Sequence, residues 1–133
     1  MVRAYYLDTS VAMRIMLGHS IEAARWFDET TADKECRIVS SRLLRTEITR
    51  VLRREGLPVL DRGQIIDHID IIPIDHAVLN EAEAIISHIR TLDAIHLASA
   101  LRSGLDDLTV VTHDKNMATV AGHLGFAVYD PVR

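Results

Sequence analysis

Cysteine is almost absent from this chain of 133 residues, in which Cys36 stands alone. A single thiol excludes a disulfide framework within the chain and a zinc site built from cysteines, and it fits a reducing compartment. No apolar run approaches the roughly 20 residues that a membrane-spanning helix needs. The first ten residues, MVRAYYLDTS, also lack the apolar stretch of a secretory signal. We therefore expect a cytoplasmic protein that does not contact the membrane.

Glycine and proline are also scarce, with six and three residues respectively. No linker rich in these residues, no internal repeat and no low-complexity segment divides the sequence. A chain of 133 residues with a hydrophobic fraction of 48% can bury one core, but it is too short for two comfortable ones. The expected organisation is a single domain that spans residues 1–133.

Short apolar runs alternate along the chain with longer stretches of helical period. The apolar runs predict strands at residues 4–7, 37–39, 71–74, 108–111 and 126–129. Helices are expected to begin near Thr9, Ile21, Ser41, Val59, His76, Leu92 and Lys115. The expected N-caps are Ser40, Asp75 and Asp114, and the expected helix ends are Gly56, Gly104 and Gly125. This alternation predicts a three-layer α/β/α fold with a central, mostly parallel five-stranded sheet.

Acidic residues outnumber basic ones, and the net charge is −4. Taken alone, this balance argues against a nucleic-acid partner, because attraction to phosphate usually supplies the affinity. The argument fails if some of the 19 acidic residues hold metal ions, since a loaded site attracts an anionic substrate through the metal. Arginine is the main basic residue, and its guanidinium group suits bidentate phosphate contacts. The charge balance therefore leaves a nucleic-acid substrate open.

Two aspartates follow closely on predicted strands. Asp8 comes after the apolar run at residues 4–7, and Asp114 comes shortly after the run at residues 108–111. In parallel sheets, ligands bind outside the carboxyl ends of the strands, where successive connections diverge to opposite faces. We therefore expect both carboxylates to lie at the ligand-binding edge of the sheet.

A third acid, Glu47, lies on or beside the buried face of a predicted helix, because apolar residues flank it at helical spacing. Burying a carboxylate without a partner costs several kcal/mol, so this side chain needs a metal, a cation or strong hydrogen bonds. One alternative is that it pairs with Arg50 or Arg54 on the flank of the same helix. Glu47 is thus a candidate metal ligand with a structural alternative.

A fourth acid, Asp93, lies one helical turn from Leu97 on the inward side of another predicted helix. Alone, it would be a carboxylate stabilised by the dipole at the helix N-terminus. Four such acids in one small domain cannot be crowded together without counter-charge, and divalent metal is the natural one. Carboxylate oxygens without a cysteine favour Mg²⁺ or Mn²⁺ over zinc. A site of this kind activates water for phosphodiester hydrolysis.

The same residues carry a resemblance to PIN-domain ribonucleases, and specifically to VapC-type toxins of toxin–antitoxin (VapBC) pairs. The matching motifs are LDTS at residues 7–10, LLRTEI at residues 43–48, LDAIHLASA at residues 92–100 and TVVTHD at residues 109–114. LDAIHLASA is the most specific of these motifs. The motifs stand in the right order, and the resemblance covers nearly the whole chain. The resemblance implies a PIN-like fold and a Mg²⁺- or Mn²⁺-dependent endoribonuclease that cleaves cellular RNA.

The resemblance also implies roles for individual residues. Asp8 and Asp93 would be the core metal ligands, and Glu47 would complete the site or support it. Asp114 would support a second metal or an ordered water. The implied candidates for supporting hydrogen bonds are Ser10 and Thr112.

Three further polar residues lie close to these motifs in the sequence. Arg14 follows Asp8 by about two helical turns, so we expect it to line the mouth of the substrate groove. Asn116 is expected to cap a helix or to support the acidic site. His96 comes one turn after Asp93, and a core or hydrogen-bonding role is commoner for such a histidine than metal ligation.

The resemblance implies partners as well. It implies a homodimer and a cognate antitoxin whose tail places a basic side chain in the acidic pocket. Two alternatives are a housekeeping RNA-processing PIN nuclease without an antitoxin and a degenerate PIN domain that acts as a binding module. The second alternative predicts the loss of an acid, and none is lost. Aspartyl-phosphate enzymes fit less well, because Thr9 and Ser10 follow Asp8 where their motif has a second aspartate.

Overall fold

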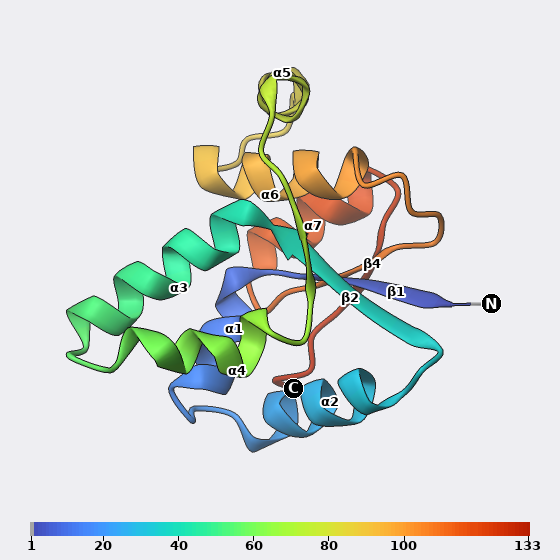
Figure 1. Cartoon of the computed structure of the whole chain (residues 1–133). Coiled ribbons are helices and arrows are strands. Elements are labelled where there is room, and N and C mark those ends of the chain that lie inside the picture. Colours follow the sequence, from blue (N-terminus) through green and yellow to red (C-terminus); the bar gives the residue numbers. More distant parts are fainter. Residues whose placement is uncertain (1) are drawn as a thin grey trace.

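The structure is a computed structural model that describes residues 2–133, and it has the predicted α/β/α architecture (Figure 1). Five strands form one sheet in the order β3-β2-β1-β4-β5, and every neighbouring pair is parallel. The strands are β1 Arg3–Leu7, β2 Cys36–Ser41, β3 Asp70–Ile72, β4 Thr109–Val111 and β5 Ala127–Tyr129. Each strand predicted from the sequence is present, and the sheet is parallel throughout.

Helices connect the strands, and all but one begin within one residue of the predicted positions. They are α1 Thr9–Met16, α2 Ile21–Ala32, α3 Arg42–Arg54, α4 Gly63–Ile66, α5 His76–Ala84, α6 Thr91–Leu101 and α7 Lys115–His123. The helix expected near Val59 is instead one turn of 3₁₀ helix, Val59–Arg62, followed by the short α4. Gly63, a poor helix former, lies at the junction and accounts for the break.

The start of α3 corrects one prediction. Ser41, rather than Ser40, is the N-cap, and its Oγ accepts a hydrogen bond of 3.0 Å from the backbone N–H of Leu43. The reason is that β2 continues two residues beyond the predicted end. Ser40 is therefore still in the sheet, where its buried hydroxyl donates a 2.6 Å hydrogen bond to the carbonyl oxygen of Leu7.

The other predicted helix caps are confirmed. Asp75 and Asp114 cap α5 and α7, because each side chain accepts a hydrogen bond of 2.9 Å from a backbone N–H three residues later. The predicted helix ends after α3, α6 and α7 all have a positive φ: Gly56, Gly104 and Gly125.

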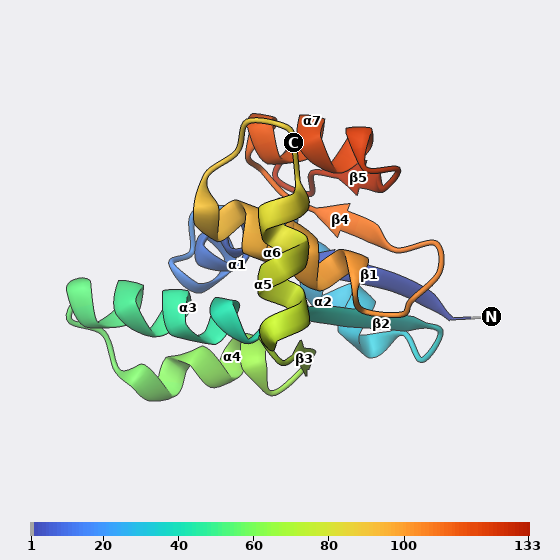
Figure 2. The ribbon, with the colours of Figure 1, turned by 90° about the horizontal axis from the view of Figure 1, so that it is seen from above.

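The sheet has a hydrophobic core on each face. Neighbouring residues of β1 point to opposite sides, so Leu7 packs with α1, α2, α3 and α4, whereas Tyr6 packs with α6 and α7. α5 lies over the outer side of α6, away from the sheet (Figures 1 and 2). The described residues therefore form three layers, with α5 added outside one of them. No helix within residues 2–133 is both long enough and apolar enough to cross a membrane.

The strand order positions the candidate site. β1 lies in the middle of the sheet, between β2 and β4. The connection from β1 to β2 runs through α1 and α2 on one face, whereas α6 and α7, which flank β4 in sequence, cover the other face. The carboxyl ends of β1 and β4 therefore lie at a point where connections diverge, and this is where parallel sheets bind ligands.

Candidate functional site

Asp8 lies at the carboxyl end of β1 and is buried, with 4% of its surface exposed. Its backbone N–H donates a 2.9 Å hydrogen bond to the carbonyl of Val111, which joins the ends of β1 and β4. Its Oδ2 accepts hydrogen bonds from the hydroxyls of Ser10 at 2.8 Å and Thr112 at 2.7 Å. Among residues 2–133, no side chain or backbone group donates to Oδ1. One carboxylate oxygen is thus held in place and the other is left free.

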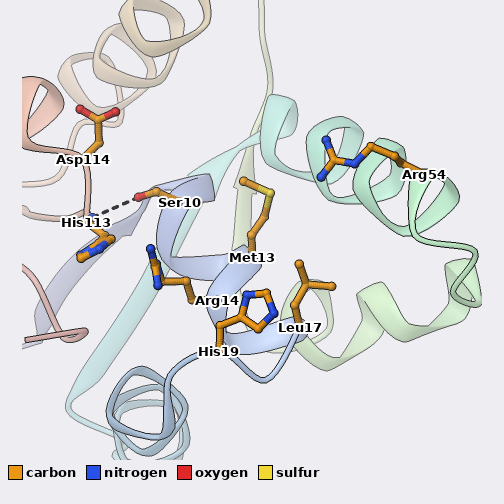
Figure 3. Close-up of a pocket in the computed structure, with 8 residues that line it drawn as sticks. All are labelled: Ser10, Met13, Arg14, Leu17, His19, Arg54, His113 and Asp114. Atoms are coloured by element: carbon orange, nitrogen blue, oxygen red, sulfur yellow. Dashed lines mark hydrogen bonds between the residues drawn. The ribbon is translucent and has the colours of Figure 1, made fainter.

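The two hydroxyls that orient Asp8 also fix the loop after β4. The backbone N–H of His113 donates to Ser10 Oγ at 3.0 Å (Figure 3). The backbone N–H of Asp114 donates to Thr112 Oγ1 at 3.1 Å. The start of α1 and the loop before α7 therefore form one hydrogen-bonded unit, and this unit brings Asp114 to the same edge of the sheet as Asp8.

Asp114 and Asp93 lie at the beginnings of α7 and α6. Asp114 caps α7 with Oδ1, while its Oδ2 accepts a 3.4 Å hydrogen bond from Nη2 of Arg90. Asp93 lies in the first turn of α6, and its Oδ2 accepts a 3.0 Å hydrogen bond from Nε of the same arginine. Burial raises the pKa of Asp93 above its usual range, and the negative charges of Asp8 and Asp114 add to this, although Arg90 opposes it. Negative charge is thus in excess here.

Glu47 on α3 is held by hydrogen bonds from α1 and α6. Its Oε1 accepts hydrogen bonds of 2.7 Å from Thr9 Oγ1 and 2.7 Å from His96 Nε2. Burial acts to raise the pKa of Glu47, but the hydrogen bonds from His96 and Thr9 outweigh it, and the net pKa lies below its usual range. The alternative that Glu47 pairs with Arg50 or Arg54 is wrong, because its partners come from α1 and α6.

His96 forms the centre of a buried chain of hydrogen bonds. Its side chain is 1% exposed, and its Nδ1 lies 2.7 Å from the hydroxyl of Tyr6. Burial and the negative charge of Asp8 raise the pKa of Tyr6 far above its usual range, so this hydroxyl keeps its proton. Nε2 lies within hydrogen-bonding distance of Glu47 and Thr9, so both ring nitrogens of His96 have partners. His96 therefore has the hydrogen-bonding role that the sequence favoured over metal ligation.

The donor set of the four acids fits a hard divalent cation. Carboxylate oxygens are the ligands that Mg²⁺ and Mn²⁺ prefer, and no thiol lies among them. Asp8, Glu47 and Asp93 each accept protein hydrogen bonds through one oxygen only, so a second oxygen of each remains free to coordinate. Within the described part of the chain, the side chains as they stand do not converge on one point in the manner of a finished metal site. Arg90 lies between two of them.

A groove of about 460 Å³ opens beside the acids (Figure 3). Arg14 lies in it, as expected from its spacing after Asp8, and its side chain is drawn close to His113 and Ser10. Among residues 2–133, Asp114 is the only acid that lines the groove, whereas two arginines and two histidines line it. The lining residues are Ser10, Met13, Arg14, Leu17, His19, Arg54, His113 and Asp114.

Three contributors to the site are not singled out by the sequence. Thr9 and Tyr6 hold Glu47 and His96, and Arg90 bridges two acids. Asn116 has a different partner from the one expected, because its amide donates to the carbonyl of His88 at 3.3 Å. The contact between Arg90 and Asp93 could have been predicted, because residues three positions apart are neighbours on one helix face.

Similar sequences indicate the family of proteins with this arrangement. Residues 5–123 match the family described as PIN domain. Ribonuclease VapC46 of Mycobacterium tuberculosis (strain ATCC 25618 / H37Rv) is 35% identical over 131 residues, which cover 96% of this chain and 98% of that protein. Ribonuclease VapC47 of Mycobacterium tuberculosis (strain CDC 1551 / Oshkosh) is 30% identical over 131 residues, covering 95% and 96% respectively.

Solved structures with the same fold come from complexes. A chain of DNA-bound VapBC from Salmonella typhimurium superposes with a TM-score of 0.74 at 15% identity, covering 98% of this chain and 99% of that chain. A chain of a toxin–antitoxin complex from Klebsiella pneumoniae gives a TM-score of 0.71 at 18% identity, with coverage of 96% and 97%. At these identities the likeness is one of fold.

Proposed function

Because the chain belongs to the PIN-domain family and, within it, to the VapC-type ribonuclease toxins, we propose that Asp8, Glu47, Asp93 and Asp114 form its metal-dependent active site. The observation that carries this proposal is the placement of the four acids at the carboxyl edge of the sheet. Three of them are oriented through one oxygen and keep the other free. A carboxylate without a counter-ion is costly in such surroundings, so the cluster is suited to a cation.

Asp8 and Asp93 are the ligands that would hold Mg²⁺ or Mn²⁺, with Glu47 completing the set and Asp114 acting through water or a second ion. When bound, the metal would lower the pKa of a water molecule and stabilise negative charge on the phosphate. The protein's own contribution is orientation. Ser10 and Thr112 hold Asp8, and His96 and Thr9 hold Glu47, so that these acids are in position before the ion arrives.

The groove beside the acids supports an RNA strand as substrate. Arg14 and Arg54 line it together with two histidines, and such side chains contact phosphates. The chain as a whole carries a net charge of −4, so a basic groove next to the acids is a local departure from the overall charge. A phosphate backbone lying in this groove would pass directly by Asp114. The protein would therefore bind RNA at the groove and cleave it at the acids.

An antitoxin is the proposed regulatory partner. Proteins of the same fold have been solved as VapBC complexes from several bacteria, which supports such a partner for this chain. A basic side chain from the antitoxin would then enter the acid cluster, and the toxin itself would form a homodimer. Size-exclusion chromatography with light scattering tests the dimer. Cell fractionation tests the expected cytoplasmic location.

The central experiment compares purified wild type with Asp8→Asn on structured RNA, with Mg²⁺ or Mn²⁺ and then with EDTA. Asp8→Asn is expected to lower the cleavage rate roughly 100-fold or more, because even residues that support metal ligands contribute about 10- to 100-fold. EDTA is expected to abolish cleavage. Asp28→Asn, at an exposed position on α2, removes the same charge and should cleave like wild type. Equal cleavage by Asp8→Asn, or full activity in EDTA, would contradict the proposal.

Growth after induced expression tests the role as a toxin. Wild type alone is expected to arrest growth, and Asp93→Asn is expected to relieve the arrest at the same protein level. The alternative is a housekeeping RNA-processing nuclease without an antitoxin. A wild-type protein that cleaves RNA in vitro but is harmless when induced would favour that alternative.

A further inference from the structure

The guanidinium of Arg90 pairs with two of the four acids. Its Nε lies 3.0 Å from Asp93 Oδ2 and its Nη2 lies 3.4 Å from Asp114 Oδ2. Among residues 2–133, no other arginine and no lysine forms an ion pair with any of the four acids. The hydrogen bond to Asp93 and the charges of Asp93, Asp114 and Asp8 all raise the pKa of Arg90. The guanidinium is therefore a counter-charge to the carboxylates of the cluster.

The side chain of Arg90 is held weakly, whereas its backbone is held firmly. Arg90 is the N-cap residue of α6, and its carbonyl accepts a 2.9 Å hydrogen bond from the backbone N–H of Ala94. Its side chain is 78% exposed, in contrast to 16% for Asp93 and 29% for Asp114. Ion pairs of an exposed arginine contribute little each and break easily. The guanidinium is thus free to leave the acids while the residue stays in place.

The oxygens that Arg90 contacts belong to two of the acids proposed to bind metal. A divalent ion and the guanidinium are both attracted by the same negative charge, and Arg90 contacts Asp93 and Asp114 together. We infer that Arg90 is an internal counter-cation that competes with the divalent ion for the acid cluster and so lowers the affinity of the site for metal. This inference rests on the proposed metal site and adds a control on its loading.

Two physical consequences follow from the competition. In the metal-free protein, Arg90 compensates the excess negative charge at Asp93, where burial and neighbouring carboxylates disfavour ionisation. When the ion binds, its positive charge repels the guanidinium that holds the same carboxylates, so part of the binding free energy is used to weaken the two ion pairs of Arg90. Removal of Arg90 therefore strengthens metal binding, although it removes contacts from the folded protein.

Isothermal titration calorimetry with Mn²⁺ on the metal-free full-length chain measures this competition. Arg90→Gln is expected to lower the Kd for Mn²⁺ about three- to tenfold, because two exposed ion pairs no longer oppose binding. Arg90→Lys keeps the charge and is expected to stay close to wild type. Arg102→Gln is the matched control, since it removes an exposed arginine from the other end of α6, where Arg102 pairs with Glu81 at 3.9 Å, and it should leave the Kd unchanged.

A Kd for Arg90→Gln that equals or exceeds that of wild type would overturn the inference, while the metal site itself would stand. Absence of Mn²⁺ binding in both proteins would overturn the metal site and the inference with it. A second readout follows the guanidinium directly, by NMR of the arginine Nε–Hε group with diamagnetic Mg²⁺. The Arg90 resonance, identified by its loss in Arg90→Gln, is expected to shift as Mg²⁺ saturates the site. An unshifted resonance at saturation would also overturn the inference.

Discussion

Glu47 and Asp93 belong to the same acid cluster, yet their surroundings differ in kind. Glu47 is held by two buried partners, Thr9 and His96. Asp93 is held by one exposed arginine and is close to the charges of other carboxylates. The pKa of Glu47 is accordingly lowered and the pKa of Asp93 is raised. Glu47 is thus part of the hydrogen-bonded framework, while the charge of Asp93 is compensated by an exposed arginine.

The two shifts have opposite effects on stability. A lowered pKa in the folded state means that Glu47 contributes stability above its unfolded pKa, and this contribution is lost as pH falls through the folded value. A raised pKa means that the stability contributed by Asp93 is present below its unfolded pKa and is lost as pH rises through the folded value. At neutral pH and without metal, Glu47 therefore stabilises the fold and Asp93 destabilises it.

The largest expected effect is on the buried chain that holds Glu47. His96→Ala should lower the free energy of unfolding by about 3 kcal/mol or more, because it creates a cavity and leaves the Tyr6 hydroxyl and Glu47 without their partner. Urea denaturation followed by circular dichroism measures the change. His123→Ala, on an exposed position of α7, should stay within about 0.5 kcal/mol of wild type. A loss below 1 kcal/mol for His96→Ala would show that the chain is not a framework.

The next effect concerns the hydroxyl that orients Asp8. Thr112→Val preserves the shape of the side chain but removes the donor to Asp8 and the acceptor for the backbone of Asp114. We expect a loss of about 1–2 kcal/mol in stability and a roughly tenfold fall in RNA cleavage. Thr109→Val, on β4 just before Thr112, removes a hydroxyl that makes no hydrogen bond to any of the acids within residues 2–133, and it should retain full activity. Unchanged cleavage by Thr112→Val would mean that Asp8 needs no orientation.

The pKa shifts of Glu47 and Asp93 have opposite signs, and they predict a smaller and more specific effect on stability. In EDTA at neutral pH, Glu47→Gln should lower the free energy of unfolding by about 1 kcal/mol, since a charge-assisted hydrogen bond becomes a neutral one. Asp93→Asn should raise it by a few tenths to about 1 kcal/mol, because a disfavoured charge is removed. The difference between wild type and Glu47→Gln should shrink as pH falls below the ordinary value of 4.5 for this carboxyl. Changes of the same sign in both variants would remove the contrast between the two acids.

The smallest effect on stability is expected in the substrate groove. Arg14→Gln should leave the fold unchanged but raise the KM for RNA about three- to tenfold and reduce the salt dependence of binding by about one unit of slope. Arg25→Gln on α2, an exposed position outside the groove, is the control. Fluorescence anisotropy with labelled RNA at several salt concentrations measures both values. An unaltered salt slope for Arg14→Gln would place the RNA elsewhere.

Much of the fold and two of the four acids follow from local pattern in the sequence. Asp8 and Asp114 are predictable because Asp8 comes directly after a short apolar run and Asp114 shortly after another, and the carboxyl ends of parallel strands share one edge. Glu47 and Asp93 are predictable in part, because helical spacing places them near the apolar face. The N-cap of α3 at Ser41 could not be predicted, since Ser40 and Ser41 are both good caps and only the pairing of the sheet decides where β2 ends.

The partners of the acids could not be predicted, because they are distant in the chain. His96 reaches Glu47 across 49 positions, and Thr9 reaches it across 38. No periodicity relates residues so far apart, so the partners of Glu47 emerge only from the packing of α1, α3 and α6. For Arg90, helical spacing accounts for the contact with Asp93, but the contact with Asp114, 24 positions away, depends on the fold.

The pairing of β1 with β4 sets the order in which the acid cluster can form during synthesis. Asp8 and Thr112, whose hydroxyl orients it, are 104 positions apart in the chain. At roughly 5–20 residues per second, Asp8 is synthesised at least about 5 s before that hydroxyl. The acids therefore become ordered only after β4 has been made and has paired with β1.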